Sequence, residues 1–175
     1  KLNKKNSPLV QLMQSVAQER FDARMRYLGA LREAHIDRIL TAQNLANARN
    51  YPVSHRACDA AYNALKTYER DQRAITDGIP ARVQSCGVSQ NARERFLAGF
   101  NSTRSMDEHF LNQSLAIQRQ QIDEVVATLN LIEPYAGKLT AKEDRLTFPK
   151  QEIADAFNDH VRNLHNLAIT EKALQ

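Results

Sequence analysis

The chain has 175 residues, of which 42% are hydrophobic and 25% are charged. These values are typical of a folded globular protein and exclude a disordered or collagen-like chain. We expect a single domain spanning residues 1–175. No segment approaches the roughly 18 consecutive apolar residues that a membrane span needs, because Thr128 and Asn130 interrupt the longest apolar run.

The net charge of +4 is unevenly distributed along the chain. Residues 1–56 hold ten Lys and Arg against four Asp and Glu, a balance of +6, which leaves −2 for the remainder. Most of these basic residues are arginines that have acidic residues within helical reach. We therefore expect a salt-bridged helix face and no nucleic-acid partner.

The first predicted element is a long helix over residues 8–50. Ser7 followed by Pro8 is typical of a helix start, and apolar residues then recur every three or four positions until Tyr51. A second apolar stripe on this helix is formed by Phe21, Leu28 and Ile39. Such a broad apolar surface predicts contact with more than one neighbour.

Three further helices are predicted. An alanine-rich segment indicates a helix over residues 54–77, ended by Gly78 and Pro80. A second long helix is expected over 89–133, kinked rather than broken near Gly99–Ser105, and a final helix over 149–173. Between the last two, the capping box that begins at Thr140 suggests a short helix over 140–146.

The two cysteines, Cys58 and Cys86, decide the predicted topology. A disulfide between them would make residues 78–86 run back along the helix that they follow, a distance that nine extended residues can span. We then expect an all-α, elongated bundle in which the long helices 8–50 and 89–133 are antiparallel. The two shorter helices would pack on opposite halves of this pair. The alternative is two unrelated thiols in a cytosolic protein.

This topology predicts a waist where the two shorter helices end. The candidate binding residues there are two groups on the long helices: Arg26, Tyr27, Arg32, His109 and Phe110.

Motifs for common enzyme classes are missing. The sequence contains no GxGxxG, GxxxxGK[ST], HExxH, GxSxG or CxxC pattern, and no Glu stands three residues before a histidine as in di-iron bundles. Glu152, Asp155, Asp159 and His160 lie near one another on the last helix, but a solvated acidic face accounts for them better than a cation site. We therefore predict no catalytic residue, no metal and no cofactor.

The function predicted from these patterns is non-enzymatic. We expect a binding or scaffold protein of a bacterial envelope, periplasmic or secreted compartment, which contacts a protein partner. Residues 1–6 would be a flexible basic tether, and any membrane contact would come through a signal, lipid or membrane anchor upstream. Two alternatives are a periplasmic helical-bundle domain that senses a ligand and a cytosolic helical adaptor. A metal or haem bundle enzyme is a further class.

Overall fold

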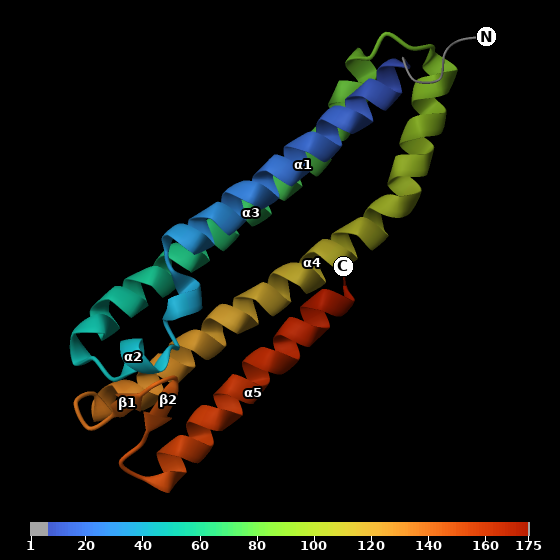
Figure 1. Ribbon diagram of the computed structural model, residues 1–175. Helices are drawn as coiled ribbons and strands as arrows, with labels where there is room; N and C mark the ends of the chain where they lie inside the picture. The colour runs from blue at the N-terminus through green and yellow to red at the C-terminus, as the bar shows by residue number, and fades with distance from the viewer. Residues whose placement is uncertain (1–6, 175) are drawn as a thin grey trace. The chain divides into compact units, whose positions relative to one another are not determined.

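The computed structural model describes residues 7–174 and confirms an all-α helical bundle. Figure 1 shows long helices that account for most of the chain. The predicted tether, residues 1–6, lies outside the described residues. The elements in chain order are α1 (Pro8–Glu33), η2 (Ile36–Arg38), α2 (Ala42–Leu45), η3 (Ala48–Asn50), α3 (Tyr51–Ser85), α4 (Gln90–Ile132), η4 (Glu133–Tyr135), β1 (Thr140–Lys142), β2 (Arg145–Thr147) and α5 (Gln151–Ala173).

The chain divides into two compact units. Unit 1 comprises the chain up to Leu28 together with Lys66–Asn112, and unit 2 comprises Gly29–Leu65 together with the chain from Gln113 onward. Helices α1, α3 and α4 each contribute residues to both units. The prediction of one domain stays a prediction.

Helix α1 ends at Glu33, so the prediction of one helix over 8–50 is wrong in its second part. His35 adopts a left-handed backbone conformation with φ 53°, which an α-helix cannot continue through. After it, amide side chains bond to the backbone: Asn44 Nδ2 donates to the Ile39 carbonyl at 2.8 Å, and Asn47 Oδ1 accepts from the Arg49 N–H at 3.1 Å. These local bonds stabilise the short helices, and the chain forms them instead of continuing α1.

Helix α3 runs from Tyr51 to Ser85, past the end predicted at residue 77. Both stop signals, Gly78 and Pro80, lie inside it. The helix continues because Ile79 and Val83, 1% and 0% exposed, belong to the apolar core of unit 1. Burial of these side chains outweighs the cost of an internal proline. The second long helix of the fold is therefore α3, not the helix that begins at Pro8.

The predicted disulfide is also wrong, because Cys58 and Cys86 are both free thiols. Cys58 lies near the start of α3 and Cys86 follows its last residue. At 1.5 Å per residue, α3 separates them by about 40 Å, far beyond the roughly 7 Å that a disulfide can bridge. Residues 78–85 continue the helix instead of reversing along it.

The remaining long helix was predicted correctly, since α4 spans Gln90–Ile132 without a break. Figure 1 shows it bending along its first half. There, the Ser102 and Thr103 hydroxyls donate to the Gly99 carbonyl at 2.7 and 3.4 Å. Side-chain bonds of this kind bend a helix without ending it.

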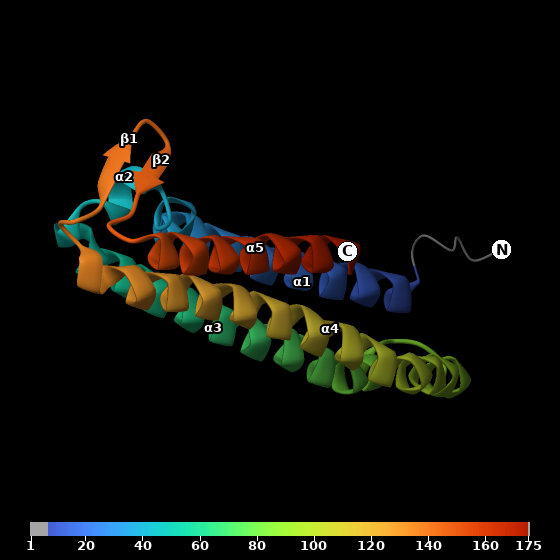
Figure 2. The ribbon, with the colours of Figure 1, turned by 90° about the horizontal axis from the view of Figure 1, so that it is seen from below.

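The connection before α5 is a β-hairpin rather than the predicted helix over 140–146. β1 and β2 pair antiparallel, with Thr140 opposite Thr147, and Glu143 in the turn has φ 55°. Gln43 of α2 donates from Nε2 to the Glu143 carbonyl at 2.6 Å and fastens the turn. Figure 2 shows the hairpin beside α2, and α5 lying along α4 within unit 2. The predicted last helix, 149–173, matches α5.

The two units have different cores. Unit 1 is centred on a small cluster: Val16, Ala23, Ile75, Ile79 and Val83. Unit 2 buries larger side chains almost completely, among them Leu45, Tyr51, Leu65, Leu129 and Ile132. Over residues 7–174, no helix is long and apolar enough to cross a membrane.

Candidate functional site

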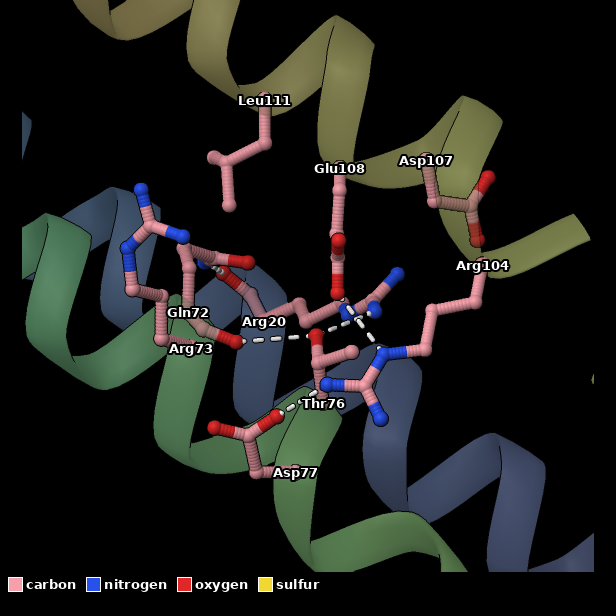
Figure 3. Close-up of a pocket in the computed structure, with 9 residues that line it drawn as sticks. All are labelled: Arg20, Gln72, Arg73, Thr76, Asp77, Arg104, Asp107, Glu108 and Leu111. Carbon is pink, nitrogen blue, oxygen red and sulfur yellow. Dashed lines mark hydrogen bonds and ion pairs between the residues drawn. The ribbon is translucent and has the colours of Figure 1, made fainter. Parts of the chain in front are cut away.

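A polar pocket of about 300 Å³ lies within unit 1 (Figure 3). Its walls come from three helices: Arg20 of α1; Gln72, Arg73, Thr76 and Asp77 of α3; Arg104, Asp107, Glu108 and Leu111 of α4. The spacing of these residues follows the helical repeat, so each helix presents one face to the pocket. Nearly every lining group can form hydrogen bonds or ion pairs.

A ring of hydrogen bonds joins α1 to α3 at one wall. Arg20 donates from Nη2 to the Thr76 hydroxyl at 2.9 Å, and that hydroxyl donates to the Gln72 carbonyl at 3.0 Å. Gln72 closes the ring by donating from Nε2 to the Arg20 carbonyl at 3.2 Å. Gln72 and Thr76 are buried, so these bonds satisfy groups that are costly to leave unpaired.

Ion pairs build the opposite wall. Arg104 lies 2.6 Å from Asp77 and 2.7 Å from Glu108, and so joins α4 to α3. The hydrogen bond to Glu108 raises the pKa of the Arg104 guanidinium above its usual range. Arg73 donates to Asn112 at 2.8 Å while paired with Glu69 at 2.9 Å. These side chains are held in fixed positions by two partners each.

Two charged groups of the pocket have no ion-pair partner within the described part of the chain. Arg20 contacts no carboxylate there, and its Nε atom is buried without a hydrogen-bond partner. Asp107, which is exposed, is the other. The pocket as a whole balances three guanidinium groups against three carboxylates. A ligand that carries both charges matches this wall better than a simple anion.

The pocket lacks the groups of a serine- or cysteine-type hydrolase. No histidine, cysteine or serine lines it, and the Thr76 hydroxyl already donates to a helix carbonyl. Serine- and cysteine-type catalysis needs a hydroxyl or thiol beside a base, and the lining presents no such pair. Among residues 7–174, no group of three or more His, Cys, Asp or Glu side chains is placed to hold a metal ion.

The five residues of the predicted waist fall into separate places. Arg26 pairs with Asp71 at 3.0 Å and lowers the pKa of that carboxyl, and buried Tyr27 stacks on Tyr68 with ring centroids 5.2 Å apart. These contacts join α1 to α3 within unit 1.

The other three are exposed. His109 and Phe110 touch each other edge to face on α4, and Arg32 lies in the last turn of α1, in unit 2. Helix α3 does not end at residue 77, so the waist lacks one of the helix ends that defined it. A binding role for these residues stays a prediction.

The pocket residues Gln72 and Thr76 were not identified from the sequence. The signal was present, because the buried stripe of α3 runs through Ala61 and Leu65 and reaches these two polar residues at helical spacing. A polar residue inside an apolar stripe indicates either a buried hydrogen bond or a site. The predicted helix over 54–77 already contained both residues, but its inward face was followed only as far as Tyr68.

A second feature of unit 1 is an apolar stripe on the exposed side of α1. It comprises Val10, Met13, Ala17, Phe21, Met25 and Leu28, which repeat every three or four residues. Phe21 is 56% exposed and Met25 is 42% exposed. This stripe lies on a different side of α1 from buried Val16 and Ala23, so α1 is apolar on two faces. We call it the α1 stripe.

A hollow in unit 2 lies between α4 and α5. Its acidic residues are engaged: Glu124 accepts from His160 at 2.6 Å and from Asn163 at 3.3 Å, and Asp123 accepts from the Tyr62 hydroxyl. His160, considered above for a cation site, therefore binds a carboxylate across the two helices. The bonds to Glu124 attach α5 to α4, and the bond to Asp123 joins α3 to α4.

Comparisons with protein-family models, with curated proteins and with solved structures found no match to this chain.

Proposed function

We propose that the chain is a non-enzymatic binding protein that recognises another protein chain through the α1 stripe. The observation that carries the proposal is the exposure of four large apolar side chains along one helix: Val10, Met13, Phe21 and Met25. Single exposed apolar residues are ordinary, but a contiguous apolar patch on a folded protein is typical of an interaction site.

The second apolar face of α1 supports this proposal. The sequence predicted that Phe21 and Leu28 belong to a stripe with a neighbour of its own, in addition to the helix's main partner. Within the described chain, Val16 and Ala23 fill the core of unit 1 while Phe21 remains half exposed. An apolar helix face that repeats every three or four residues is the surface used in helix-in-groove and helix-pair recognition. The stripe therefore suits a helical partner.

The compartment is a separate question. The envelope or secreted location predicted above depended chiefly on a disulfide that the free thiols exclude. It stays a prediction, and so does the cytosolic adaptor, which two free thiols favour.

Photo-crosslinking in cells of the native host tests the proposal. A photoreactive phenylalanine analogue replaces Phe21 in one variant and Val53 of α3 in the other, since both side chains are 56% exposed. We expect discrete protein adducts at position 21 and none at position 53. Equal labelling at both positions, or no adduct at position 21, would contradict a partner on the α1 stripe.

The polar pocket favours a second candidate function, the binding of a small zwitterion such as an amino acid. The supporting observation is that Arg20 and Asp107 are charged, line the same pocket and have no ion-pair partner in the described part of the chain. Calorimetric titration with the twenty amino acids tests it. Any heat of binding should disappear in Arg20→Gln and persist in Arg95→Gln, an exposed arginine of α4 outside the pocket. Absence of heat for every amino acid would contradict it.

A further inference from the structure

The α1 stripe has a symmetric spacing. Its six residues, Val10, Met13, Ala17, Phe21, Met25 and Leu28, are separated by intervals of three, four, four, four and three. Read from either end, the order of intervals is the same, with its centre at position 19. Large residues occupy both ends, and the small Ala17 stands at the position related by symmetry to Phe21.

We propose that the partner on the α1 stripe is a second copy of this chain, with the two α1 helices packed antiparallel around position 19. This inference rests on the proposed function, because it names the partner of the same stripe. A two-fold pair requires that residue i of one copy contacts residue j of the other and the reverse. The symmetric spacing meets that requirement.

The side chains are complementary in this arrangement. Val10 meets Leu28 of the second copy, Met13 meets Met25, and the small Ala17 meets Phe21. Each large aromatic ring thus lies over an alanine, which lets the helices approach closely. In a parallel pair, Phe21 would meet Phe21 and Ala17 would meet Ala17. The two aromatic rings would then crowd each other, and the two alanines would leave a gap between the helices.

Charge favours the same orientation. Between Val10 and Leu28, Arg24 is the one charged residue on this side of α1, and antiparallel packing places it opposite Gln14. Parallel packing would place Arg24 opposite Arg24, and like charges that face each other are destabilising. Glu19, at the centre of symmetry, points away from the stripe and pairs with Arg82 of α3 at 2.7 Å. The central position therefore brings no charge into the interface.

Helix packing rules give the crossing angle. The stripe contains intervals of both three and four residues, and helices that combine these two spacings pack at about +20°, which keeps them in contact along their length. The footprint is at most roughly 27 by 10 Å on each copy, from the helix rise and diameter. Stable interfaces bury about 800 Å² on each partner, so we expect a dimer that dissociates in the micromolar range or above.

Sedimentation equilibrium over a wide range of concentrations tests the association. We expect the average mass of the chain to rise from 19.9 kDa toward twice that value as concentration increases. Phe21→Ser should weaken the association at least tenfold. Val53→Ser, which removes an equally exposed apolar side chain from α3, should leave it unchanged. Circular dichroism confirms that each variant is folded.

Cysteine crosslinking tests the orientation. In a background with Cys58→Ala and Cys86→Ser, we mix the Met13→Cys and Met25→Cys variants under mild oxidation. Antiparallel packing predicts a disulfide between the two variants and little within either alone, because each residue lies about 18 Å along the helix from its own copy. Efficient crosslinking of Met13→Cys to itself would overturn the antiparallel pair.

The two proposals fail in different ways. A chain that stays monomeric at the highest concentration overturns the second copy as partner. If position 21 nevertheless crosslinks to a different protein in cells, the proposed function stands without the dimer. If position 21 crosslinks to nothing, both proposals fall.

Discussion

Units 1 and 2 are built from the same long helices but bury very different amounts of apolar surface. Among the described residues, unit 1 buries six apolar side chains and unit 2 buries sixteen. The contrast is clearest within α4, whose buried residues all lie from Leu115 onward. Unit 1 instead holds the polar pocket and the α1 stripe. A continuous helix can therefore contribute many buried residues to one unit and few to the other.

The largest expected effect compares two isoleucines of similar burial. Ile132 of unit 2 is 0% exposed and Ile79 of unit 1 is 1% exposed. We expect Ile132→Ala to lower the free energy of unfolding by about 4 kcal/mol and Ile79→Ala by about 2 kcal/mol. The smaller cost reflects the partly buried neighbours of Ile79, which can move into the space.

Urea unfolding followed by circular dichroism measures both changes. Ala98→Gly, at an exposed position of α4, is the control for a substitution that only lowers helix propensity. Equal costs at the two isoleucines would mean that the cores of the units differ in size but not in tightness of packing.

Hydrogen exchange along α4 is the next test. Amides over residues 95–110 belong to unit 1 and those over 115–130 to unit 2. Local opening is easier where little apolar surface is buried, so we expect at least tenfold faster exchange in the first segment. This corresponds to a free energy of opening that is lower by about 1.4 kcal/mol. Uniform protection from end to end would show that α4 opens as one unit.

Thiol reactivity separates the two cysteines. Burial raises the pKa of the Cys58 thiol to about 11, so it is protonated at pH 8 and inaccessible. Cys86 is half-buried, in the segment after α3. We expect one thiol to react with Ellman's reagent in the native protein and the second only on unfolding. The Cys86→Ser variant should therefore show no fast phase, and a fast phase in it would contradict the buried position of Cys58.

The smallest effect concerns the ion pair between Glu19 and Arg82, which links α1 to α3 in unit 1. Hydrogen bonds from Arg82 lower the pKa of Glu19 below its usual value. A depressed folded pKa gives stability that is present above the unfolded pKa, near 4.5, and is lost as pH falls through the folded value. Glu19→Gln should cost about 0.5–1 kcal/mol at pH 7, because both side chains are partly exposed.

Unfolding at pH 7 and pH 3 measures this pair. Glu94→Gln is the matched control, since exposed Glu94 bonds only the nearby Gln90 side chain. The difference between Glu19→Gln and the control should shrink at pH 3. A difference that is independent of pH would show that the carboxylate charge does not stabilise unit 1.

The sequence predicts elements well where local signals agree with packing. Helices α4 and α5 have long apolar repeats and clear ends, so their bounds were predicted within about two residues. The end of α1 was missed because Leu45 and Ala48 continue the helical spacing, whereas the break depends on the left-handed backbone at His35. The hairpin was missed because the residues from Thr140 to Glu143 also fit a capping box.

Tertiary packing accounts for the other differences. Gly78 and Pro80 are local stop signals, and only the burial of Ile79 and Val83 carries α3 past them. That extension removes the disulfide. The polar pocket depends on how α1, α3 and α4 pack against one another, which the spacing of residues along each helix does not show. Of the α1 stripe, the predicted second apolar stripe contained Phe21 and Leu28. Its third member, Ile39, lies beyond the end of α1 and is buried.

Pro80 has a consequence for the backbone of α3. Proline has no backbone N–H, so the Thr76 carbonyl, four residues earlier, lacks its usual donor within α3. An internal proline thus leaves one helix carbonyl able to accept a hydrogen bond from a side chain or from an ordered water molecule.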